Sequence, residues 1–248
     1  MTRVDQPLTI RSGTRIGLLS TVDSPFLVRT IQALLQDDIA VDSVFLDSQL
    51  QTSRDLAIHH ERTGGRFPAR PLDECEEEGI PFYFVRNHSS EMTAALVRKR
   101  QIDLLVNAGT PRILGPDILA APRRGILNCH PGLLPEFRGC SCVEWAIYLD
   151  QQVGNTVHFM NEGIDEGPIV LREGLTFGKR ETYVDVRVKV HEHGLDLLAR
   201  AVKRLIETQL SPSSFGPQGE GRYFRAMQPA LLEDVKWKLE RGEYVYQR

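Results

Sequence analysis

The chain has 248 residues, of which 41% are hydrophobic and 25% are charged, an ordinary composition for a globular protein. Its formal net charge of −3 gives no electrostatic reason to expect a nucleic acid or an anionic membrane surface as partner. No apolar run approaches the roughly 20 residues that a membrane helix needs, and the first residues lack the apolar stretch of a secretory signal. We therefore expect a cytoplasmic enzyme.

The N-terminal part of the chain alternates between strand and helix patterns. Residues 15–20 are predicted to form a buried strand, and residues 41–46 the next strand. Between them, Ser24 is predicted to cap a helix with Pro25 at its first position, because serine and proline are favoured there. Apolar residues then recur at helical spacing, namely Phe26, Leu27, Ile31, Leu34 and Leu35. A strand, a helix and a strand in this order form the βαβ unit of a parallel sheet.

The middle of the chain resumes this alternation after a less regular stretch. The predicted elements are a helix over 50–62, a loop over 63–71, a helical turn over 72–78, a strand over 81–85, a helix over 90–100 and a strand over 102–107. The last strand runs directly into a loop over 108–111. Because ligands of open α/β sheets bind at the carboxyl ends of strands, this loop is a candidate binding segment.

The C-terminal half has one long helix and a linker-like stretch. The predicted elements are a helix through Trp145, short strands over 157–160 and 169–171, a long amphipathic helix within 182–210 and a short final helix over 231–241. Residues 211–221 have the composition of a linker. We predict an α/β fold with a mostly parallel sheet, divided into a catalytic domain over 1–210 and a C-terminal linker and helical appendage over 211–248.

The four cysteines raise the question of a metal site. Cys129, Cys140, Cys142 and His130 fall within fourteen positions, which invites a zinc interpretation. Cys140 and Cys142 are separated by one residue, however, whereas structural zinc sites space paired ligands by two to four. We predict no metal site and interpret the cysteines as reduced, buried thiols.

The candidate catalytic residues are Asn128, His130 and Asp165. Asn128 and His130 lie two apart at a strand end, so both side chains can project toward one cleft. Asp165 lies in a glycine-flanked loop from which a carboxylate can approach a histidine. These groups suit acyl transfer to an amine. Such a reaction requires no serine or cysteine nucleophile, because the amine itself is the nucleophile. The amide and a protonated imidazole would donate hydrogen bonds to the oxygen of the tetrahedral intermediate, and the carboxylate would orient the imidazole and favour its charged form.

Each of these residues also has an ordinary structural interpretation. Taken singly, Asn128 and His130 are more often a helix or turn cap and a hydrogen-bonded loop histidine than catalysts. Asp165 alone would usually be a turn residue. The combination, with the sequence around it, favours the catalytic interpretation.

The motifs resemble those of the folate-dependent formyltransferase family. They are Asn-Cys-His-Pro-Gly-Leu-Leu-Pro over 128–135, Arg-Gly over 138–139 and Ile-Asp-Glu-Gly-Pro-Ile over 164–169. The similarity covers roughly 14–210, and several motifs match in a fixed order. The family includes glycinamide ribonucleotide formyltransferases, methionyl-tRNA formyltransferases and sugar N-formyltransferases.

The resemblance implies a Rossmann-like formyltransferase domain that uses 10-formyltetrahydrofolate as co-substrate. It implies that Asn128, His130 and Asp165 are the catalytic residues. The residues expected to bind the folate are Pro111, Arg112, Ile113 and Leu114 on one side, and Asn161, Gly163 and Ile164 in the loop over 161–167 on the other. Arg138 and Gly132 are expected to contact the second substrate, although Arg138 could equally be solvated.

The sequence also bears on the acceptor. Residues 20–25 contain no glycine and include Asp23, which argues against the phosphate-binding loop of the glycinamide ribonucleotide enzymes. Only about forty residues follow Thr208 and the net charge is negative, which argues against tRNA. The run from Arg138 to Trp145 looks more like the sugar-modifying branch. We therefore expect a nucleotide-linked amino sugar such as GDP-perosamine.

Three questions stay open from the sequence. Water could replace the amine, giving a 10-formyltetrahydrofolate hydrolase that uses the same three residues. The chain could instead be a non-catalytic folate- or nucleotide-binding member of the family. Finally, residues 231–248 could cover a partner subunit of a homodimer as easily as their own domain.

Overall fold

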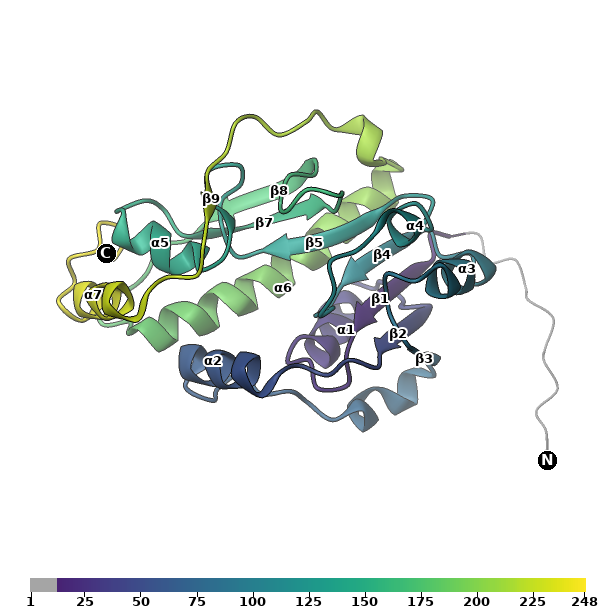
Figure 1. Ribbon diagram of the computed structural model, residues 1–248, viewed down its shortest axis with the longest axis horizontal. Helices are drawn as coiled ribbons and strands as arrows, with labels where there is room; N and C mark the ends of the chain where they lie inside the picture. Colours follow the sequence, from purple (N-terminus) through teal and green to yellow (C-terminus); the bar gives the residue numbers. More distant parts are fainter. Residues whose placement is uncertain (1–12) are drawn as a thin grey trace.

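The computed structural model describes residues 13–248, so the first twelve residues of the predicted catalytic domain lie outside the described part. The main strands are β1 (Ile16–Ser20), β2 (Ser43–Asp47), β3 (Phe82–Val85), β4 (Leu104–Asn107), β5 (Ile126–His130), β7 (Gly154–Phe159) and β8 (Ile169–Gly174). They form one seven-stranded sheet in the order β3-β2-β1-β4-β5-β7-β8 (Figure 1). The strands from β1 to β5 pair in parallel, whereas β7 is antiparallel to both β5 and β8. The predicted α/β fold with a mostly parallel sheet is confirmed.

Seven α-helices and two short 3-10 helices are found in the described residues. They are α1 (Leu27–Gln36), α2 (Ser53–Thr63), α3 (Glu91–Lys99), α4 (Pro116–Leu119), α5 (Cys142–Tyr148), α6 (Tyr183–Thr208), α7 (Pro229–Glu240), η1 (Leu72–Glu78) and η2 (Pro212–Ser214). None of the helices within residues 13–248 is long and apolar enough to span a membrane.

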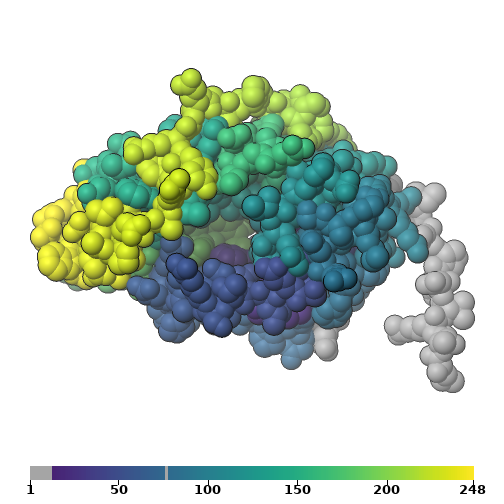
Figure 2. All heavy atoms as spheres, viewed as in Figure 1, coloured from purple at the N-terminus to yellow at the C-terminus, as the bar shows by residue number. Residues whose placement is uncertain are grey.

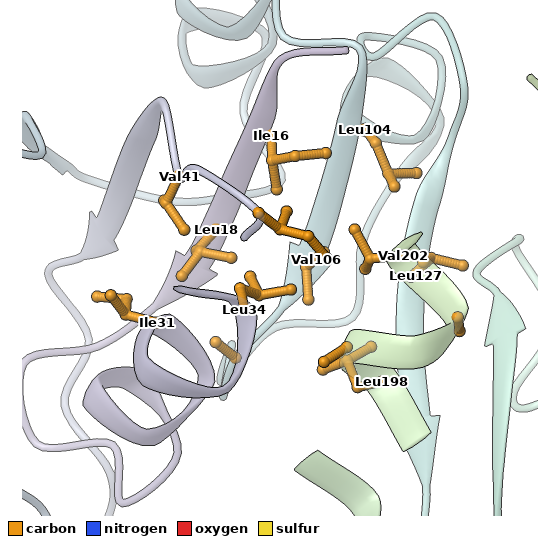
Figure 3. Packing of buried hydrophobic residues seen from close by; sticks show 14 of the residues in the cluster. Ile16, Leu18, Ile31, Leu34, Val41, Leu104, Val106, Leu127, Leu198 and Val202 are labelled. Carbon is orange, nitrogen blue, oxygen red and sulfur yellow. The ribbon is translucent and has the colours of Figure 1, made fainter. Parts of the chain in front are cut away.

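Apolar side chains cover both faces of the sheet. On one face, Ile31 and Leu34 of α1 and Leu198 and Val202 of α6 are buried against the strands. Figure 3 shows the strand residues that they face, which include Leu18, Val106 and Leu127. On the other face, α3 and α4 contribute to a second cluster with Leu105 and Ile126. Because the central strands are buried on both sides, they read as continuous apolar runs rather than alternating ones.

Helix α1 begins later than the sequence predicted. Its first residue is Leu27, and Phe26 occupies the capping position without a side-chain cap. The Ser24 hydroxyl does accept a hydrogen bond from the Phe26 amide (3.2 Å), but it also donates to the carbonyl oxygen of Ala108 (2.9 Å). The prediction of Ser24 as the cap is therefore wrong by two residues, because this serine joins the loop after β1 to the loop after β4.

The C-terminal segment returns to the carboxyl end of the sheet. A two-residue strand β9 (Tyr223–Phe224) pairs in parallel with β6 (Arg138–Gly139). The Trp145 indole donates to the Arg225 carbonyl (2.8 Å), and Phe224 stacks on Phe137 with ring centroids 5.1 Å apart. Helix α7 then packs against α5 at one end of the molecule (Figure 1). The division at residue 210 stays a prediction, and the segment after it shares its apolar core with the preceding part.

Candidate active site

The predicted catalytic residues meet where β5 ends. Asn128 and His130 lie on β5, and Asp165 lies in the connection between β7 and β8. The Asp165 Oδ2 atom is 3.4 Å from Nδ1 of His130 and accepts a hydrogen bond from the Gly139 amide (2.9 Å). Asp165 has a positive φ of 56°, which an aspartate tolerates better than most residues. The structure therefore brings the amide, the imidazole and the carboxylate together.

The loop that carries Asp165 is fixed from two sides. Gly167 lies so close to β7 that an added Cβ would be 1.8 Å from the Phe159 carbonyl oxygen, so only glycine fits there. From the other side, the Gln218 side-chain amide donates to the carbonyl oxygens of Asp165 (3.1 Å) and Gly167 (2.6 Å). The linker-like stretch thus holds the backbone of the loop that carries Asp165, a role that its composition did not indicate.

His130 is buried and has both ring nitrogens near acceptors. Its Nε2 donates to the Phe137 carbonyl (2.7 Å), which leaves Nδ1 facing Asp165. Burial lowers the pKa of His130 below 6.5, although Asp165 and the Phe137 carbonyl favour the protonated ring. Asn128 lines a cleft, whereas His130 is 4% exposed and its Nε2 is bonded to the Phe137 carbonyl, so its access to the same cleft stays a prediction.

Asn128 belongs to a chain of hydrogen bonds that sets the orientation of its amide. Its Oδ1 accepts from Nδ2 of Asn107 (2.9 Å), whose own Oδ1 accepts from the Gly109 and Thr110 amides. Its Nδ2 donates to Nε2 of His158 (3.2 Å). The orientation is assigned from these partners. One N–H of Asn128 then has no partner in the described part of the chain, and Asn128 lines the cleft.

His158 is a site residue that the sequence reasoning missed. It lies opposite Asn128 across the antiparallel pair of β5 and β7. Its Nδ1 donates to the Phe159 carbonyl (2.9 Å), so Nε2 is free to accept from Asn128. Burial lowers the pKa of His158, with His130 acting in the same direction and Asp165 opposing it. The neutral ring is thereby favoured, and it is the neutral ring that can accept a hydrogen bond at Nε2.

The first predicted folate-binding segment, residues 111–114, is held in place by Arg112 and exposes the side chain of Ile113. Arg112 makes two hydrogen bonds to the buried carboxylate of Asp47 (3.0 and 2.8 Å). Ile113 is 82% exposed, whereas Leu114 is buried in the same cluster against which Met160 packs. Ile164, in the second predicted segment, is 50% exposed. Each predicted segment thus exposes an isoleucine that could contact an apolar ring system, and folate binding by these residues stays a prediction.

The two predicted substrate-contacting residues lie close to the predicted catalytic group. Arg138 Nη2 donates to Gln218 Oε1 (3.1 Å) and to the Gly219 carbonyl (3.0 Å), and Nη1 is 3.6 Å from Glu166. A Cβ on Gly132 would be 2.8 Å from Nε2 of His130, so this glycine permits the histidine to pack closely. Their contact with a substrate stays a prediction.

A cleft opens beside Asn128. It has a volume of about 710 Å³ and is lined by residues of α2, β5 and α6 and by the loop over 139–141, and we call it the α2–α6 cleft. Figure 2 shows the hollow between the blue atoms of α2 and the teal atoms above it. Its size lies in the range of small-molecule sites, which is about 300–1,000 Å³. In the described part of the chain, no three His, Cys, Asp or Glu side chains are grouped as metal ligands.

An open α/β sheet with a polar group and a cleft at the carboxyl ends of its strands defines an α/β ligand-binding or catalytic domain. This chain belongs to the formyl transferase family, whose model matches residues 14–202. Enzymes of this family use 10-formyltetrahydrofolate.

Individual relatives differ in what their names say about the acceptor. Methionyl-tRNA formyltransferase of Synechocystis sp. is 30% identical over 191 residues, which are 75% of this chain and 55% of that protein. The chain spans about half the length of the curated relatives it matches. Among solved structures, glycinamide ribonucleotide transformylase 1 from Symbiobacterium toebii has a TM-score of 0.62 at 22% identity, with 90% of this chain and 99% of that chain covered. A sugar N-formyltransferase from Shewanella sp. has a TM-score of 0.58 at 20% identity, with 92% and 87% covered. At these identities the structural likeness shows the fold.

The buried histidines predict loss of stability in mild acid. Burial lowers the pKa values of His88, His130, His158 and His191 below 6.5. Below about pH 6.5 the unfolded chain therefore binds more protons than the folded one. The free energy of unfolding then falls by up to about 1.4 kcal/mol for each tenfold difference in proton affinity between the two states. We expect the Tm to fall between pH 7.5 and 5.5, measured by calorimetry. A Tm that stays constant or rises over this range would contradict the assignment, because carboxylates lose their contribution only at lower pH.

Proposed function

We propose that the chain is an N-formyltransferase that moves a formyl group from 10-formyltetrahydrofolate to the amine of a small substrate. The observation that carries this proposal is the Asn128 amide, which is held from both ends, has one N–H without a partner in the described part of the chain, and belongs to a residue that lines the α2–α6 cleft. An oriented N–H beside a buried histidine and carboxylate suits stabilisation of an oxyanion. Family membership and the two isoleucine-bearing segments support the choice of donor.

Each residue has a distinct role in the proposed reaction. The unprotonated amine attacks the formyl carbon, and the free N–H of Asn128 donates to the oxygen that becomes negative. A proton taken up by His130 lies on Nδ1, because Nε2 already carries the hydrogen that it donates to Phe137. The Asp165 carboxylate faces that proton and stabilises the charged ring. The proton is the one that the amine loses when its bond to the formyl carbon forms. When the intermediate collapses, the bond between the formyl carbon and N10 of the folate breaks and N10 receives that proton, which releases tetrahydrofolate and the N-formyl product.

The acceptor that we propose is a nucleotide-linked amino sugar such as GDP-perosamine. The loop after β1 supports the exclusion of glycinamide ribonucleotide, because both of its serine hydroxyls are bonded within the protein and it carries an aspartate. The hydroxyls of Ser20 and Ser24 donate to the Ala108 carbonyl (2.6 and 2.9 Å), and Asp23 accepts from the Gln51 amide (2.9 Å). The negative charge of Asp23 in this loop would repel a phosphate.

A turnover assay with 10-formyltetrahydrofolate tests the proposed function. Its acceptor panel contains GDP-, UDP- and dTDP-linked amino sugars, glycinamide ribonucleotide and a blank without acceptor. We expect tetrahydrofolate to form only with a nucleotide-linked amino sugar. Formate release in the blank would identify a hydrolase instead, and tight folate binding without turnover on any amine would indicate a non-catalytic binding protein.

A further inference from the structure

Three helices bring charged side chains together at the wall of the α2–α6 cleft. Glu144 of α5 is almost fully buried, with 1% of its side chain exposed. Its Oε1 lies 3.4 Å from Nε of Arg62 on α2 and 3.7 Å from Nη1 of Arg187 on α6, and it accepts from the Tyr183 hydroxyl (2.7 Å). Arg62 and Arg187 both line the cleft. Two guanidinium groups therefore share one carboxylate at this wall.

The wall has an excess of positive charge. Burial alone would raise the pKa of Glu144, but Arg187 and Arg62 hold it below its usual value, so the carboxylate is ionised and balances one of the two arginines. Arg54 and Asp55 also line the cleft and carry opposite charges, so the excess at this wall comes from the second arginine beside Glu144. A cleft whose wall carries more positive than negative charge attracts an anionic ligand.

Two buried nitrogen atoms at this wall have no partner within the described residues. One is Nε of Arg187, whose side chain is 5% exposed, and the other is Nε2 of His191, one helical turn further along α6. Both residues line the cleft. Buried polar groups in folded proteins are nearly always hydrogen-bonded, so a ligand oxygen at the cleft could satisfy the arginine donor. The same wall also holds a buried acceptor that is unpaired in the described part of the chain, Oε2 of Glu144. Oxygen atoms of an anion would satisfy the arginine donor.

We propose that Arg62 and Arg187 bind a phosphoryl group of the formyl acceptor, an inference that rests on the proposed function of the same cleft. Arginine forks match phosphate oxygens in geometry and charge. The same cleft reaches Asn128, so an acceptor held at its phosphoryl group by α2 and α6 extends its amine toward the reacting end. A volume of about 710 Å³ suits a nucleotide-linked acceptor better than a free amino acid that would offer a carboxylate.

Titration calorimetry with inorganic pyrophosphate and with GDP measures this site without any formyl transfer. The variants are Arg62→Gln, which removes a half-buried guanidinium, and Arg187→Gln, which removes the buried one. Arg66→Gln is the matched control, because Arg66 pairs with Asp185 (2.7 Å) on the surface. Thermal melts confirm that each variant is folded.

Wild type and Arg66→Gln are expected to bind both probes with equal affinity. Arg62→Gln and Arg187→Gln are expected to bind about ten- to a hundredfold more weakly, the loss typical of a charge-assisted hydrogen bond. Absence of binding to wild type, or equal binding by folded Arg62→Gln and Arg66→Gln, would overturn the inference. So would equal turnover of an amino sugar with and without its nucleotide, although the proposed function would then stand. Probe binding as expected, with no amine formylated, would support the anion site and refute the proposed function.

Discussion

Replacing Asn128 by alanine is expected to lower kcat for formyl transfer by about 10²–10³-fold, the loss measured when one oxyanion donor is removed. The KM for the acceptor should change little, because the missing N–H acts on charge that develops only in the transition state. Steady-state kinetics with the acceptor identified in the turnover assay measure both constants. A folded Asn128→Ala enzyme with nearly normal kcat would refute the oxyanion role.

The hydrogen-bonded chain around Asn128 supplies a sharper control. Asn107→Asp keeps an oxygen that can accept from the Gly109 and Thr110 amides, but it loses the donor to Oδ1 of Asn128. The side-chain amide of Asn128 is then expected to rotate by about 180°, so that its oxygen faces the reacting group instead of its N–H. The value of kcat should therefore fall while the loop over 108–111 stays in place. A normal kcat in Asn107→Asp, together with a loss of stability in Asn107→Leu, would contradict this role. Asn107 would then only support the loop and would not orient the Asn128 amide.

The sequence predicted a mostly parallel sheet from local patterns, and the three catalytic candidates from their residue types together with the family resemblance. The strands β1 and β4 are short apolar runs followed by turn-forming residues, and the amphipathic face of α6 packs on the sheet as expected. Asn128, His130 and Asp165 were found because each lies within a short continuous motif, over 128–135 or over 164–169. Their meeting depends on β7 turning back antiparallel to β5, which no local pattern specifies.

The residues that the sequence missed act through tertiary contacts. His158 lies 30 positions from Asn128, and the strand register alone places the two side by side. Glu144 would normally be interpreted as a solvated helix residue, and its burial is stabilised by an arginine from each of α2 and α6 and by the Tyr183 hydroxyl. The strands β6 and β9 have two residues each, too few for an alternating pattern to be recognised.

Replacing Asp165 by asparagine is expected to lower kcat by about 10²–10⁴-fold, the range for loss of effective proton transfer. An asparagine oxygen can still accept from the Gly139 amide, so the loop should keep its position. The negative charge beside Nδ1 of His130 is lost, however, and with it the stabilisation of a proton on that atom. Because Asp165 raises the pKa of His130 against the effect of burial, the pKa of His130 should fall further in the variant.

Two measurements separate this charge effect from a structural one. NMR titration of the His130 ring should show its midpoint at lower pH in Asp165→Asn than in wild type, and kinetics should show the loss in kcat. Asp196→Asn, an exposed aspartate on α6 that pairs with Arg200 (2.8 Å), is the control and should change neither. An unchanged His130 titration together with a normal kcat would mean that Asp165 serves only to fix its loop, since a carboxylate that stabilises the transferred proton must affect both.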